Sequence, residues 1–108
     1  MIKASRVVFV SDDLENSFNS LPEDDFLKKS MKQAIQNLRG NAFYGIHVPK
    51  RLIPKEYIQK WGIKNLWKYD LPKGWRLMYT ITADNEVDLI SAILEWCDHK
   101  DYERRFKY

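Results

Sequence analysis

The chain has 108 residues, of which 44% are hydrophobic and 31% are charged, and its formal net charge is +3. This length suits one domain with a modest core over residues 1–108, and the composition argues against extended disorder. No apolar run approaches the roughly 20 residues of a membrane-spanning helix, so we expect no membrane partner and a cytoplasmic location.

The N-terminal part predicts one strand followed by two helices. The β-branched run 6–10 predicts a strand, and the cap-forming residues after it favour a first helix over residues 12–20. Pro22 marks a second start, and apolar residues at helical spacing predict an amphipathic helix over 23–39 that ends at Gly40. Its apolar face contains Leu27, Met31, Ala34, Ile35 and Leu38. Its opposite face, which we expect to be solvated, carries Lys28, Lys29 and Lys32.

Residues 41–64 predict little regular structure, because Pro49 and Pro54 interrupt any strand or long helix. Only residues 54–61 fit a short helix, with proline in its first turn. His47 stands alone in this stretch, which is more typical of an incidental histidine than of a catalytic one. We therefore expect a long excursion before the next strand.

A hairpin with two unlike faces follows over residues 66–79, where two alternating strands flank a proline–glycine turn. A slip of one residue would move charged side chains into the core. The register that avoids this places Asp70 opposite Arg76 and Lys68 opposite Met78, with the extra residue absorbed in a bulge near Gly74. The apolar face then contains Trp67, Tyr69, Leu71, Trp75, Leu77, Tyr79 and Ile81.

Positive charge is concentrated between residues 50 and 76, where eight basic residues stand against two acids. Tyrosines and tryptophans are interleaved with these cations. Such a mixture suits a surface that binds phosphates and stacks bases, but it also fits a solvated basic face over an aromatic core. The segment alone leaves both interpretations open.

The C-terminal part predicts a buried strand and a terminal helix. Residues 87–97 are apolar at successive positions, which is typical of a strand inside a sheet, and Asp84 and Asn85 supply the turn before it. The single cysteine, Cys97, lacks a second cysteine or histidine at metal-ligand spacing, so we expect a buried, inert thiol and no metal. Asp98 is the expected N-cap of the last helix.

The order strand, helix, helix, strand, strand, strand, with the motifs Arg-Leu-Met-Tyr at 76–79 and His-Lys-Asp-Tyr at 99–102, resembles the RelE/ParE superfamily of bacterial and archaeal toxins. The resemblance implies an α+β, microbial-RNase-like domain. Its sheet would be antiparallel-rich with about four strands, two N-terminal helices packed on it and a short C-terminal helix.

The same resemblance implies a RelE-like toxin of a type II toxin–antitoxin system, a ribosome-dependent and metal-independent mRNA endoribonuclease without cofactor. Its partners would be RNA, the ribosome and a cognate antitoxin. The alternative is a non-catalytic binding protein on the same fold, either a ParE-like contact inhibitor or an inactive RNA binder. A structural or regulatory domain without toxicity is a third interpretation.

Carried over onto this chain, the family's catalytic positions correspond to Arg76, His99 and Tyr102, and the RNA-binding positions to Lys68, Lys73 and Lys100. Arginine and lysine would stabilise the charge on phosphate, and histidine suits proton transfer. Two features oppose this assignment. Asp70 would face and neutralise Arg76, and a straight last strand would carry His99 about six residues, roughly 20 Å, beyond Arg76. A bulge or a terminal helix folded back would then be needed.

Overall fold

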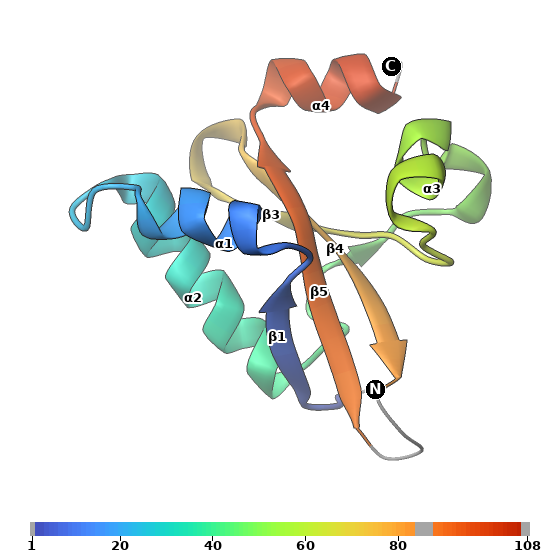
Figure 1. Ribbon diagram of the computed structural model, residues 1–108, viewed down its shortest axis with the longest axis horizontal. Coiled ribbons are helices and arrows are strands. Elements are labelled where there is room, and N and C mark those ends of the chain that lie inside the picture. Colours follow the sequence, from blue (N-terminus) through green and yellow to red (C-terminus); the bar gives the residue numbers. More distant parts are fainter. Residues whose placement is uncertain (1, 84–87, 107–108) are drawn as a thin grey trace.

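A five-stranded mixed sheet in the order β1-β5-β4-β3-β2 forms the centre of this α+β molecule (Figure 1). The computed structural model describes residues 2–83 and 88–106. The strands are β1 (Ser5–Phe9), β2 (Ile46–His47), β3 (Trp67–Asp70), β4 (Arg76–Ala83) and β5 (Leu89–Cys97). The helices are α1 (Asp12–Asn19), α2 (Phe26–Gly40), α3 (Lys55–Trp61) and α4 (His99–Phe106), with short 3₁₀ turns at Lys50–Leu52 and Pro72–Gly74. Within the described residues, no helix combines the length and apolar composition that a bilayer crossing requires.

The sheet has one strand more than the sequence predicted. β1 runs parallel to β5, whereas the other neighbours are antiparallel. The additional strand, β2, consists of two residues within the stretch expected to be an excursion. Gly45 allows β2 to approach β3, because glycine has no Cβ atom. A Cβ atom at this position would lie 2.5 Å from the Lys68 carbonyl oxygen.

The predicted hairpin register is confirmed. Asp70 pairs with Arg76 and Lys68 with Met78, and the intervening partners, Tyr69 and Leu77, lie on the opposite face. The extra residue is accommodated in the turn itself, where Lys73 and Gly74 adopt positive φ values of 61° and 79°. All seven predicted apolar residues belong to, or pack against, one core with the first two helices.

The pairing of β4 with β5 corrects the expected position of His99. Arg76 pairs with Cys97, so His99 lies two residues, and not six, beyond the position opposite Arg76. One residue of this shift comes from a bulge at Leu94, since Met78 pairs with Glu95 but Tyr79 pairs with Ile93. The rest follows from the pairing of Ala83 with Leu89. The turn predicted at residues 84–85 lies outside the described ranges.

The two faces of the sheet carry separate cores. α1 and α2 cover one face through Phe18, Leu27 and Met31, while α3 and α4 pack on the other through Tyr57 and Tyr102. The bulge turns two consecutive β5 side chains, Leu94 and Glu95, toward the face occupied by α3 and α4. In Figure 1, α4 follows β5 directly and lies across its end.

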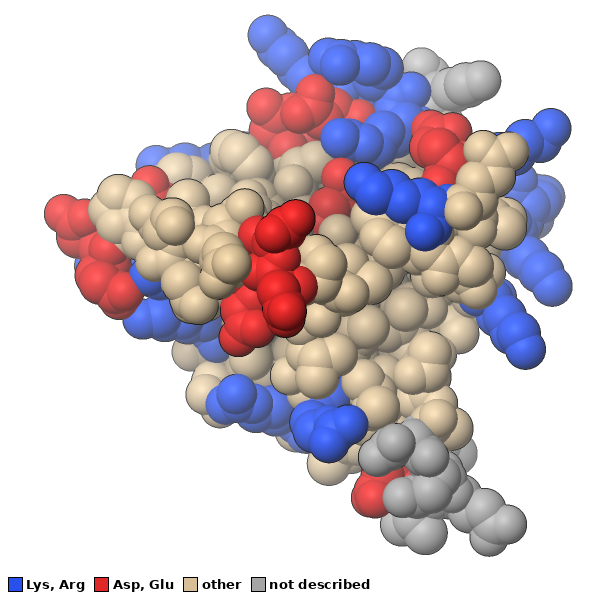
Figure 2. Space-filling model, in the orientation of Figure 1, with Lys and Arg blue, Asp and Glu red and all other residues tan. Residues whose placement is uncertain are grey.

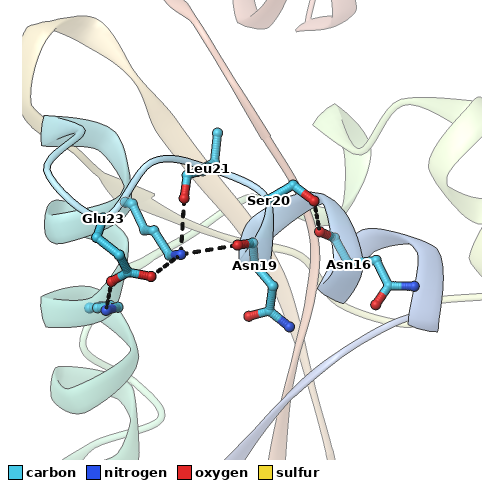
Figure 3. Close-up of polar contacts among 7 residues, drawn as sticks. Asn16, Asn19, Ser20, Leu21 and Glu23 are labelled. Carbon is cyan, nitrogen blue, oxygen red and sulfur yellow. Dashed lines mark hydrogen bonds and ion pairs between the residues drawn. The ribbon is translucent and has the colours of Figure 1, made fainter.

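The second helix differs from its prediction in two respects: the residue at which it begins, and the burial of one of its lysines. α2 begins three residues later than expected, because the Asp25 side chain accepts a hydrogen bond from the Leu27 N–H and caps it there. Lys28, expected on a solvated face, is only 3% exposed. Its Nζ donates to the carbonyl oxygens of Asn19 and Leu21 and to Glu23 (Figure 3). The loop between α1 and α2 therefore closes around this ammonium group.

The Glu23 carboxylate makes stability depend on pH. Hydrogen bonds from Lys28 and Lys32 lower the pKa of Glu23 from 4.5 to about 2. Because the folded pKa is depressed, this stabilisation is fully present above pH 4.5 and is lost as the pH falls toward 2.

We expect Glu23→Gln to lower the free energy of unfolding at pH 7, and the difference from wild type to shrink between pH 4.5 and 2. Urea titrations across this range measure it. The matched control is Asp24→Asn, and an equal pH dependence in both variants would contradict the assignment.

Candidate functional site

Three of the predicted site residues meet where β3, β4 and α4 come together. The Lys68 Nζ and the Arg76 guanidinium carbon each lie 5.3 Å from the centre of the Tyr102 ring. The pairing of Arg76 with Cys97 brings the start of α4 to this end of the sheet. The Asp98 carboxylate, accepting from the Asp101 N–H at 2.9 Å, then caps the helix as predicted. Two cations and an aromatic ring thus form one cluster.

Tyr102 has a structural position in this cluster. Its side chain is buried at 4% exposure, and its ring stacks on Phe106 at a centroid distance of 4.4 Å. Lys68 and Arg76 lie within cation–π range of the same ring. A base has no open face of Tyr102 to stack on in this arrangement, so the ring acts by holding the two cations in place.

Arg76 is paired with Asp70, as the hairpin register predicted. Its Nε lies 3.0 Å from the Asp70 Oδ1, and one Nη donates to the Trp75 carbonyl oxygen at 3.2 Å. The arginine side chain is 18% exposed, whereas the aspartate side chain is 51% exposed. A phosphate group that binds Arg76 must therefore compete with an exposed carboxylate.

His99 reaches the same end of the sheet but does not join the cluster. A Cβ atom at Gly74 would lie 3.3 Å from the His99 Cβ, so the histidine sits beside the hairpin turn. Its Nε2 lies 2.8 Å from the Glu103 Oε1, one helical turn further along α4. Among the described residues, Glu103 is the only carboxylate with which His99 forms an ion pair.

The two remaining predicted RNA-binding lysines point to different places. Lys73 extends toward the start of α2, where its Nζ lies 4.2 Å from the centre of the Phe26 ring. Lys100 is exposed in the first turn of α4. The exposed lysines of α3, Lys55 and Lys60, lie on the side of α3 and α4, where Figure 2 shows many lysine and arginine side chains.

A second polar group, which the sequence analysis missed, lies under α3 and α4. The Tyr57 hydroxyl donates to the Glu95 Oε2, and the Glu95 Oε1 lies 3.3 Å from an Arg105 Nη. Burial, reinforced by the neighbouring carboxylate, raises the pKa of Tyr57 above its ordinary value. An acid within an apolar strand was the available signal, because a buried carboxylate requires a partner. The group links α3, β5 and α4 beneath the cation cluster.

Cys97 has the environment expected of an inert thiol. The side chain is 3% exposed, and burial raises its pKa to about 11. The thiolate is therefore scarce near neutral pH, which makes nucleophilic chemistry unfavourable. Within the described ranges, no group of three or more histidine, cysteine, aspartate or glutamate side chains is arranged to hold a metal ion.

The arrangement can bind an anion at the exposed margin of the cation cluster. Arg76 offers a planar donor group for phosphate and Lys68 adds a second charge from the neighbouring strand. The family assignment has no further support, because the chain matches no protein-family model and no curated protein or solved structure is significantly similar to it. The resemblance to RelE/ParE toxins therefore rests on the order of the elements and on the two short motifs.

Proposed function

We propose that the protein is a RelE-like toxin, a metal-independent endoribonuclease that cleaves mRNA on the ribosome. The observation that supports this proposal most directly is the convergence of Lys68 and Arg76 on the Tyr102 ring, each at 5.3 Å. Arg76 and Tyr102, which come from the two separate motifs, and Lys68 on β3 meet in one cluster. The exposed lysines on α3 and α4 extend the positive surface around it.

The chemistry proposed for this site needs little besides positive charge and proton transfer. The ribose 2′-hydroxyl attacks the adjacent phosphorus, the bond to the 5′-oxygen of the next nucleotide breaks, and a cyclic phosphate and a free 5′-hydroxyl result. Arg76 and Lys68 stabilise the charge that develops on the phosphorane oxygens. His99 supplies proton transfer in this proposal, after its imidazole leaves Glu103.

Expression of the wild-type chain without an antitoxin tests the proposal. We expect growth arrest, and mRNA recovered from translating ribosomes should carry new 5′ ends within the decoding site. A short reading frame beside this gene would encode the proposed antitoxin, and its co-expression should restore growth. If the cells show no growth arrest and the mRNA is not cleaved, the toxin proposal is contradicted.

A second candidate is a non-catalytic binding protein that inhibits its target by contact or holds RNA without cutting it. The Arg76–Asp70 ion pair favours this candidate, because it neutralises the charge that cleavage requires. Tyr102, buried beneath Phe106, also takes no direct part in proton transfer in this arrangement. Growth arrest with uncut mRNA would support the contact inhibitor over the nuclease.

A further inference from the structure

An open groove crosses the sheet between α1 and α3, at a distance from the cation cluster. Two adjoining hollows with volumes of about 530 and 360 Å³ form it, and they share Val10, Trp61 and Leu94. Small side chains from β4 and β5 line its floor: Thr80, Thr82, Ala83 and Ala92. In Figure 1, α1 and α3 lie on opposite sides of β5, and Figure 2 shows an uncharged surface between them. We refer to this feature as the α1–α3 groove.

The floor of the α1–α3 groove restricts the backbone of any polypeptide that fills it. β4 and β5 are interior strands, hydrogen-bonded to neighbours on both sides. They offer no free N–H or C=O groups to an added strand. An occupant must therefore satisfy its own backbone, as an α-helix does, and the small side chains of the floor allow a helix to approach closely.

The two walls of the α1–α3 groove differ in charge. Asp13 lines it from α1, which also carries Asp12 and Glu15 in its first turn. Lys60 and Lys64 line it from α3 and the segment that follows. Within the described residues, neither Asp13 nor Lys60 forms an ion pair, and the Lys60 Nζ lies over the Trp61 ring at 5.1 Å. Figure 2 shows the acidic and basic patches on either side of the groove.

We propose that the α1–α3 groove binds an amphipathic helix from a protein partner. The apolar face of this helix rests on Val10 and Trp61, which line both hollows. A basic flank lies along the acidic α1 wall, and an acidic flank lies along the basic α3 wall, because opposite charges at the rim select the partner. This surface is separate from the cation cluster, so the proposal does not depend on nuclease activity.

Three synthetic helical peptides of about 14 residues, roughly 21 Å long at 1.5 Å per residue, test the proposal. They share one apolar face and differ in their flanks, which carry lysine and glutamate, lysine on both sides, or glutamate on both sides. The shift of the Trp61 indole resonance, assigned with Trp61→Phe, reports binding. We expect the mixed peptide to bind the wild-type protein tightest, by on the order of threefold over the other two.

Variants of the walls should change this order in a defined way. Ser17→Lys adds a cation to the α1 wall without removing an acid from the first turn of α1, and the preference should move toward the glutamate peptide. Lys60→Glu combined with Lys64→Glu makes both walls acidic, and the lysine peptide should then bind best. A preference that ignores these wall charges would overturn the proposal.

An apolar-floor variant completes the test. Val10→Asp should weaken binding of the mixed peptide by about tenfold or more, since it puts a charge against the apolar face. Ile46→Asp, at an exposed position on β2, is the matched control and should leave binding unchanged. Absence of binding at millimolar peptide would overturn the proposal. So would self-association of the wild-type chain that fills the groove with a second copy.

Discussion

Replacing Arg76 by alanine is expected to lower the rate of RNA cleavage by about 100- to 1000-fold, which corresponds to roughly 2.7 to 4 kcal/mol in the barrier. The reason is that charge on the phosphorane develops mainly in the transition state, where a fixed guanidinium stabilises it most. The fold should survive, because Arg76 lies over the Tyr102 ring at the margin of the α3/α4 core and is not one of the apolar residues that fill it. Single-turnover cleavage on programmed ribosomes and circular dichroism measure the two effects.

Two further variants make the Arg76 result specific. Arg39→Ala removes an exposed arginine from α2 and should leave cleavage unchanged. Asp70→Asn should act in the opposite direction to Arg76→Ala and tighten RNA binding. It removes the carboxylate that lies 3.0 Å from the Arg76 Nε and competes with phosphate for the guanidinium group. Cleavage at the wild-type rate in a folded Arg76→Ala protein would contradict the proposed role of this residue.

Replacing Leu38 by alanine is expected to lower the free energy of unfolding by about 2 to 5 kcal/mol. Leu38 has no exposed surface and belongs to the core between α2 and the sheet. Removing its side chain leaves a cavity, because β1 is tied to this turn of the helix by the Ser5 hydroxyl, which donates to the Leu38 carbonyl oxygen at 2.7 Å. Urea unfolding measures the change.

The control for Leu38 is Ile58→Ala on α3. This side chain is 45% exposed, so its truncation should change stability by less than about 0.5 kcal/mol. If Leu38→Ala also lowers the free energy of unfolding by less than about 0.5 kcal/mol, the face of α2 assigned to the contact with the sheet is wrong.

The hairpin could be predicted from the sequence because its alternation is unambiguous. Only one register keeps Trp67, Tyr69 and Leu77 together and leaves Lys68 and Asp70 outside, so local pattern and long-range packing agree. The α2 core face was predicted for the same reason: buried residues recur at helical spacing. In both cases the information lies within about 15 neighbouring residues.

The arrangement around α4 could not be predicted in this way. The bulge at Leu94 lies in a largely apolar strand, where the alternation is too weak to mark an inserted residue. It nevertheless shifts the register of the residues that follow and helps to bring Tyr102 to Lys68 and Arg76. The two-residue strand β2 gave no periodic signal either. Lys28 is buried only because carbonyl groups from another segment surround it, which depends on the path of the preceding loop.

The Tyr57–Glu95–Arg105 group shows what limits residue-by-residue inference. Each partner lies on a different element, and none belongs to a motif shared with the others. Glu95 alone carried a signal, as an acid in an apolar strand. Its partners follow from the packing of α3 and α4, which is a property of the folded chain.

The parallel pairing of β1 with β5 is expected to slow folding. The Ser5 and Ser91 hydroxyls, joined across these strands at 2.8 Å, are 86 positions apart. The β3–β4 hairpin can form from neighbouring residues, whereas β1 must wait for β5, which stands between it and β4. Closing so long a loop costs entropy before the contacts compensate for it, and contacts of high sequence separation slow folding. During synthesis, β1 would therefore join the sheet only after β5 had left the ribosome.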